Sequence, residues 1–163
     1  MIRENARMCL RQLSMIGAAA FGLGILPLYA TVSNWSVTPS AVTFTSGNPA
    51  GSVTGVPSTT TVSFKTSANP ASFTVHVKAV SPNFSGCNAP PATAVTVSCS
   101  SPSGLTCTAA ATLSNSGNGT TVATGTGNHN PASFVLTYNF QDSWSYQQGA
   151  TCSLSTQIIY TEP

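Results

Sequence analysis

The chain has 163 residues, of which only 5% carry a charged side chain, and its formal net charge is +2 at pH 7. Three of its five basic residues, Arg3, Arg7 and Arg11, lie near the start, so from residue 31 onward two lysines balance two carboxylates. A neutral chain has neither the basic surface that nucleic-acid phosphates require nor a polybasic stripe for anionic lipids. We therefore expect no nucleic-acid partner.

Residues 1–30 have the pattern of a signal peptide. The basic start is followed by an apolar stretch from Met15 to Leu28, and Leu28-Tyr29-Ala30 provides a small-residue cleavage site. The apolar stretch is short and rich in glycine for a membrane span, although an uncleaved anchor is the alternative. We expect cleavage near Ala30, secretion or display at the cell surface, and no stable membrane span after processing.

Residues 31–163 are predicted to form one β-sandwich domain. This length is that of one ordinary domain with its own core. About a third of these residues are Ser or Thr, with Val, Phe and Tyr interspersed. Such a composition favours strands over helices. The predicted fold is all-β, a single antiparallel β-sandwich of immunoglobulin-like or Greek-key type.

The first half of the domain shows short strands separated by loops. Residues 34–44 predict a short strand pair or one strand bent at Pro39, and residues 46–57 predict a loop. In residues 61–65 and 73–79, apolar and polar side chains alternate with the period of a strand. This phase places Lys65, His76 and Lys78 on outward faces.

The middle of the domain predicts two hairpins. Val95, Val97 and Cys99 form an inward series, Pro102 to Gly104 a turn, and Leu105 with Cys107 the start of a partner strand. Residues 114–127 are rich in Gly, Ser, Thr and Asn, with one short strand around Val122. We expect this second segment to be an exposed hairpin.

The stretch from Ser133 to Tyr160 has the clearest pattern in the chain. Two alternating segments, residues 134–140 and 152–160, flank a turn at residues 141–149 and predict a closing hairpin. Two strands cannot bury their own apolar face, so the rest of the domain must supply a second layer. The predicted core comprises Phe73, Val75, Val77, Phe134, Leu136, Tyr138, Leu154 and Ile158.

Four cysteines follow the leader, namely Cys87, Cys99, Cys107 and Cys152. An even number in an exported chain predicts two disulfides. The favoured pairing joins Cys99 to Cys107 across the expected hairpin and leaves Cys87 for Cys152. The alternative joins Cys99 to Cys152 across the sheets and Cys87 to Cys107. Because the spacings are irregular and no C-x-x-C pair occurs, a zinc site is not expected.

Few titratable groups are available for catalysis after processing. They comprise His76, His129, Asp142, Glu162, the lysines and the tyrosines. No G-x-S-x-G elbow occurs, and the only two carboxylates are far apart in the sequence, one of them close to the end of the chain. We expect no enzyme activity, no catalytic residue, no metal and no cofactor.

Trp144, Tyr146 and Asp142 are the candidate ligand contacts. Aromatic rings on a sandwich loop can stack on sugar rings while a nearby carboxylate bonds hydroxyls. This gives a carbohydrate-binding module as one hypothesis. The alternative is that these aromatic rings cap the core and that Asp142 forms an Asx-type turn with the serines that follow it.

The strands rich in Ser and Thr, the cysteines and the final alternation near the C-terminus resemble small secreted bacterial β-sandwich proteins of the spore-coat U and fimbrial-subunit kind. That resemblance implies an immunoglobulin-like fold and surface polymers in which a terminal strand of one subunit completes the sheet of the next. Two features depart from it: four cysteines instead of two, and no long donor segment before the first strand. Sheet edges with so little charge invite pairing with another chain. We expect a structural or adhesive protein whose partner is another copy, a cell-surface component or a glycan.

Overall fold

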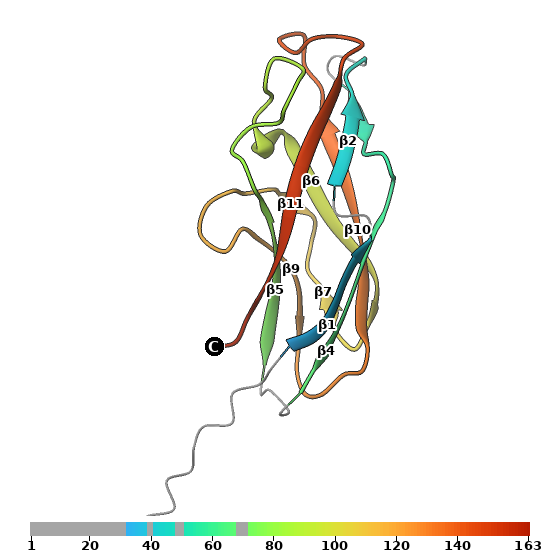
Figure 1. Ribbon diagram of the computed structural model, residues 1–163, viewed down its shortest axis with the longest axis vertical. Helices are drawn as coiled ribbons and strands as arrows, with labels where there is room; N and C mark the ends of the chain where they lie inside the picture. The colour runs from blue at the N-terminus through green and yellow to red at the C-terminus, as the bar shows by residue number, and fades with distance from the viewer. Residues whose placement is uncertain (1–31, 39–40, 48–50, 68–71) are drawn as a thin grey trace, which may run out of the picture.

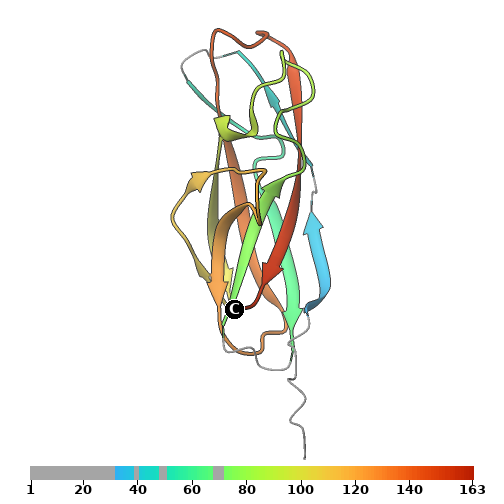
Figure 2. The same ribbon diagram turned by 90° about the vertical axis from the view of Figure 1, so that its left-hand side faces the viewer.

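Two antiparallel sheets packed face to face form the structure, as the sequence predicts. The computed structural model describes residues 32–38, 41–47, 51–67 and 72–163. The proposed signal peptide and its cleavage site lie outside these residues. Figures 1 and 2 show the sandwich as an elongated body, with the strands running along its long axis.

Each sheet has a continuous strand order. Sheet I has the order β1-β4-β10-β6-β8, with β3 also pairing with β10, and sheet II has the order β2-β11-β5-β9-β7. The strands of sheet I are β1 (Val32–Thr38), β3 (Ser52–Thr54), β4 (Thr60–Thr66), β6 (Val95–Ser103), β8 (Ala111–Thr112) and β10 (Ala132–Gln141). Those of sheet II are β2 (Ala41–Thr45), β5 (Phe73–Ala79), β7 (Thr106–Cys107), β9 (Thr120–Gly125) and β11 (Thr151–Thr161). A 3-10 turn, η1 (Ala92–Ala94), precedes β6.

The predicted strand phase is confirmed. The predicted core residues on β5 and β10 and Leu154 on β11 are all at most 1% exposed, whereas Ile158 is half-buried. Lys65, His76 and Lys78 lie on the outward faces and are half-buried. Successive side chains of a strand point to opposite faces, so the sequence pattern identifies the buried face directly.

Aromatic rings fill both ends of the core. Near one end, Phe44 lies 5.5 Å from Phe84 and 5.6 Å from Phe140, measured between ring centroids. Near the other, Phe73 lies 6.1 Å from Phe64. The inner faces of the two sheets therefore interdigitate over the whole length of the sandwich.

The predicted hairpins are wrong. From β4 to β11, each of the seven connections passes from one sheet to the other. The β10 and β11 strands, expected to form the closing hairpin, lie in opposite sheets, and residues 142–150 between them arch over one end of the core (Figure 1). Likewise β6 belongs to sheet I and β7 to sheet II.

The favoured disulfide pairing is confirmed although the expected hairpin is absent. Cys99 is bonded to Cys107, eight residues away, and Cys87 to Cys152, 65 residues away. The first bond joins β6 to β7 and so connects the two sheets. The second connects the β5–β6 segment to the start of β11. Two disulfides indicate an oxidising environment.

Two segments differ from their expected structure. The short strand expected around Val122 is present as β9, but it pairs with β5 and β7 and buries Val122 and Ala123, so residues 114–127 do not form an exposed hairpin. Residues 46–57 contain β3, which pairs with β10 at Asn139–Gln141. Short strands flanked by Gly and Ser carry little periodic signal.

The connections favour the Greek-key alternative. In immunoglobulin domains the last two strands pair within one sheet, whereas here they lie in opposite sheets. Jelly-roll sandwiches are a double-sheet form of the Greek key and also carry the chain between sheets.

Truncating a buried side chain of β10 tests the strand phase. Phe134→Ala or Leu136→Ala should lower the free energy of unfolding by about 2 to 5 kcal/mol, because each leaves a cavity between the sheets. Val135→Ala, on the outward face of the same strand, is the matched control and should cost clearly less. Urea unfolding of the oxidised protein measures the difference, and equal losses at positions 134 and 135 would contradict the assigned phase.

Alkaline pH should destabilise the fold through Tyr138. Burial raises the pKa of its phenol from 10.0 to about 12, against a weaker opposing effect of the hydrogen bond to the Thr156 hydroxyl. The unfolded chain therefore loses the proton first, and stability falls from pH 10 towards pH 12. This group alone should account for about 2 to 3 kcal/mol. Urea midpoints at pH 8 and pH 11 should differ less in Tyr138→Phe than in the original protein.

Candidate functional site

The aromatic loop between β10 and β11 was the first candidate site. Trp144 is 79% exposed and is the most exposed large hydrophobic side chain among the described residues. Tyr146 is half-buried, and its ring lies 5.4 Å from that of Phe140. The two rings therefore do not form one exposed platform, because Tyr146 caps the core and Trp144 faces solvent.

Asp142 anchors this loop and is not exposed to a ligand. Its side chain is only 2% exposed. The Oδ1 atom accepts hydrogen bonds from Ser46 Oγ and the Ser143 N–H, both at 2.8 Å, and Oδ2 accepts one from the Gly47 N–H at 2.9 Å. The carboxylate thus joins the end of β10 to the chain that follows β2. This corrects the expectation that Asp142 contacts a bound sugar.

Asp142→Asn should therefore destabilise the protein. An amide keeps one acceptor oxygen and turns an NH2 group towards a donor, so at least one buried hydrogen bond is lost, at a cost of about 1 to 3 kcal/mol. Gln147→Ala, whose exposed side chain lies in the same loop, is the control and should change stability little. Thermal unfolding compares the two, and an unchanged Asp142→Asn melting temperature would show that these bonds do not support the fold.

Apart from Tyr160, whose hydroxyl donates to Glu162 Oε1 at 2.9 Å, the described titratable groups do not converge. His76 Nε2 lies 3.0 Å from Thr161 Oγ1, its Nδ1 lies 3.2 Å from Thr121 Oγ1, and burial lowers the pKa of its ring. His129 Nε2 donates to the Thr126 carbonyl at 2.7 Å. In the described ranges, no three His, Cys, Asp or Glu side chains lie close enough to hold a metal ion. Those ranges also contain no helix long and apolar enough to cross a membrane.

The sheet edges differ in how well they are covered. The outer edge of β2 is closed, because Thr43 and Val56 exchange backbone hydrogen bonds of 2.9 and 2.7 Å. The opposite edges, β7 and β8, are only two residues long. Short or covered edges offer little backbone for another strand.

The lower half of β11, residues 156–161, leaves an edge open. Ser153 exchanges backbone hydrogen bonds with Ser85, and the Ser155 carbonyl accepts one from the Val80 N–H. These backbone groups of β11 therefore point away from β2. Because these directions alternate along a strand, the backbone groups of Ile158 and Tyr160 point to the β2 side. The β2 strand ends its pairing at Ser155, so within the described chain these groups have no ladder partner.

The open edge lies beside an incompletely covered part of the core. Ile158 and Tyr160 on β11 are only partly buried, as are Val32 and Val37 on β1, the edge strand of sheet I on the same side. The Tyr160 ring stacks on Phe73 with centroids 5.3 Å apart. We give the name seam to Ile158, Tyr160, Val32 and Val37. Its apolar side chains and open backbone are what an added β-strand requires.

The two strands of the seam are not equally regular. The pairing of β1 with β4 shifts register between Ser33 and Ser36, whereas β11 pairs with β5 continuously from Thr156 to Thr161. Edge irregularities hinder the addition of another strand. The β11 edge is therefore the better template. Sequence alone did not show it, because the edge depends on where the pairing between β2 and β11 stops.

Comparisons with protein-family models, with curated proteins and with solved structures gave no match. The resemblance to spore-coat U and fimbrial subunits therefore stays a prediction, and the functional argument depends on the site itself.

Proposed function

We propose that this is a non-enzymatic structural or adhesive protein, secreted or displayed at the cell surface, that associates with copies of itself through the β11 edge. The observation that carries the proposal is the seam, where the backbone of Ile158 and Tyr160, which has no ladder partner among the described residues on the β2 side, adjoins half-buried apolar side chains. A strand from a second copy would pair with this backbone and cover Ile158, Tyr160 and the core behind them.

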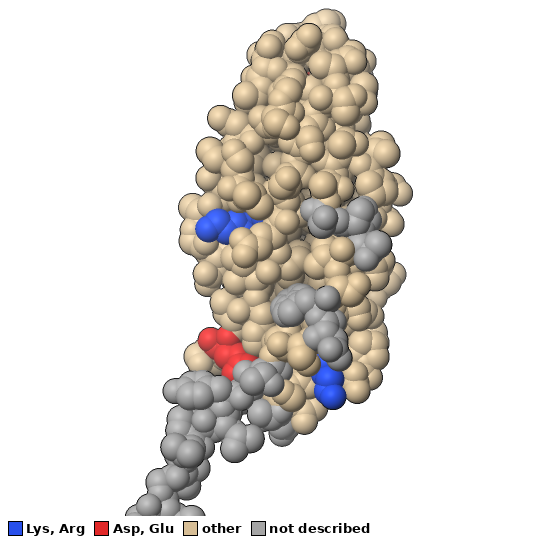
Figure 3. Space-filling model, viewed as in Figure 1, with Lys and Arg blue, Asp and Glu red and all other residues tan. Residues whose placement is uncertain are grey.

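The charge distribution supports close approach of identical copies. On the face that Figure 3 shows, the described residues carry small, separate charged patches and are otherwise uncharged. Asp142 is buried, and Lys78 Nζ donates to the Gly117 carbonyl at 2.8 Å. Identical subunits therefore repel one another little, while the outward Ser and Thr side chains keep the faces hydrated.

Export is part of the proposal. The basic and apolar pattern of residues 1–30 supports a cleaved signal peptide, and two disulfides suit a protein that works outside the cell. The material for any functional test is therefore the secreted, oxidised chain. Its intact mass should correspond to a start near Thr31 with both disulfides formed.

Blocking the seam should abolish self-association. Ile158→Lys places a charge that points inward at the open edge, a device that prevents edge pairing. The unaltered protein should form concentration-dependent oligomers or fibres in size-exclusion chromatography with light scattering and in negative-stain microscopy. The Ile158→Lys variant should remain monomeric.

Ser155→Lys is the matched control for this experiment. It adds the same charge three residues away, on the exposed outer face. It should still associate, which separates blocking of the seam from a simple change in net charge. Circular dichroism verifies that both variants are folded. A concentration-independent monomer for the unaltered protein, or equal association of both variants, would refute self-association through this edge.

A carbohydrate-binding module at the aromatic loop is the second candidate. It now depends on Trp144 alone, since Asp142 is buried and Tyr146 packs on Phe140. The exposure of Trp144 to solvent favours the carbohydrate-binding function. Glycan binding that is lost on Trp144→Ala would support this function.

A further inference from the structure

The outer face of sheet II carries a row of four threonines, one from each of four adjacent strands. The strand register pairs Thr161 of β11 with Thr74 of β5, Thr74 with Thr124 of β9, and Thr124 with Thr106 of β7. With neighbouring strands about 4.8 Å apart, the row extends about 14 Å across the sheet. Its members are exposed or half-buried.

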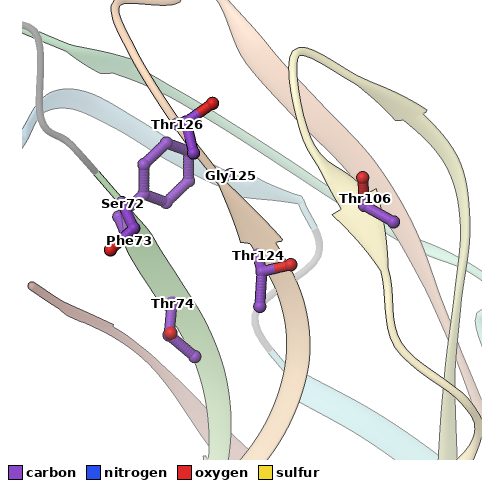
Figure 4. A pocket seen from close by; sticks show the side chains of 7 residues that line it. All are labelled: Ser72, Phe73, Thr74, Thr106, Thr124, Gly125 and Thr126. Atoms are coloured by element: carbon purple, nitrogen blue, oxygen red, sulfur yellow. The ribbon is translucent and has the colours of Figure 1, made fainter. Parts of the chain in front are cut away.

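Three threonines of the row line a hollow in the surface, whereas the hydroxyl of the fourth, Thr161, lies 3.0 Å from His76 Nε2. Thr74, Thr106 and Thr124, together with Ser72 and Thr126, border a pocket of about 320 Å³ (Figure 4). A second hollow of about 210 Å³ shares Thr106 and Thr126 with the first and reaches the side chains of Leu105 and His129. The two hollows adjoin at these shared residues, and we call them together the trough. Its border combines the hydroxyl side chains with Phe73, Leu105, His129 and two glycines.

The hydroxyls of this trough are available for a ligand. Further along the same sheet, Thr108 Oγ1 donates to the Thr121 carbonyl at 2.9 Å, and Thr120 Oγ1 donates to the Thr112 carbonyl at 2.7 Å. Among the described residues, by contrast, the side-chain hydroxyls that border the first hollow have no hydrogen-bond partner. They belong to Ser72, Thr74, Thr106, Thr124 and Thr126. Each can both donate and accept a hydrogen bond.

The trough is rigid and uncharged. Threonine side chains have few rotamers, so little freedom is lost when they are bound. The two-residue strand β7 is fixed because Cys107, next to Thr106, is bonded to Cys99 of the opposite sheet. Within the part of the chain that the structure describes, no charged residue borders either hollow. Such a site offers no electrostatic attraction for an ionic ligand.

We propose that the trough binds a neutral, extended glycan chain laid along the threonine row. A sugar chain presents hydroxyls that can donate and accept, which matches the hydroxyls of the trough, and it carries no charge to desolvate. A straight row suits an extended β-1,4-linked chain better than a curved α-1,4-linked one. The trough is separate from the seam and from Trp144, so the inference does not depend on self-association or on the aromatic loop.

Nuclear magnetic resonance titration tests this site directly. Cellotetraose and maltotetraose are added to the ¹⁵N-labelled, oxidised protein, and shifts caused by dilution alone are subtracted. Cellotetraose should move the amide signals of Thr74, Thr106 and Thr124 with a dissociation constant in the millimolar range, and maltotetraose should bind more weakly. The double variant Thr106→Val/Thr124→Val should bind about tenfold more weakly, because it keeps the shape of the strands and removes two hydroxyls.

Thr96→Val is the matched control, since it removes an exposed threonine hydroxyl from sheet I. It should leave binding unchanged. The proposal would be overturned if neither sugar shifted the trough signals. It would also be overturned if the shifts clustered around Trp144 and disappeared in Trp144→Ala, or if the double valine variant bound as tightly as the original protein.

Discussion

The structure depends on contact between the inner faces of two sheets, because no consecutive pair of strands from β4 onward can stabilise itself. Each of these connections leads to the opposite sheet, so every ladder joins strands that are not consecutive in the chain. The closure entropy of such long loops must be overcome before the ladders form. The core is therefore the element that makes all the ladders possible, and the disulfide between β6 and β7 reinforces the same contact between sheets.

The sequence predicted which face of a strand is buried, but it did not predict which strands pair with each other. Alternation in residues 73–79 and 134–140 predicted which side chains are buried, since that property depends only on each strand itself. The same alternation cannot say whether β11 pairs with β10 or with β5, because both arrangements bury the same side chains. The favoured Cys99–Cys107 bond proved right because eight residues keep two cysteines close, whichever sheet each belongs to.

The candidate sites were harder to predict for a related reason. The aromatic loop was visible in the sequence, but only the structure distinguishes exposed Trp144 from packed Tyr146 and buried Asp142. The seam depends on β2 ending its pairing at Ser155 while β11 continues to Thr161. The threonine row depends on the register of four strands. Each is a property of long-range pairing, which a local pattern does not contain.

The start of β1 and the C-terminus lie at one end of the sandwich, and the loop that carries Trp144 lies at the other (Figures 1 and 2). The two ends of the sandwich therefore differ, since one carries the termini of the domain and the other carries the aromatic loop. A domain tethered by either terminus would stand upright and present its aromatic loop to the surroundings, while the seam and the trough would remain near the point of attachment.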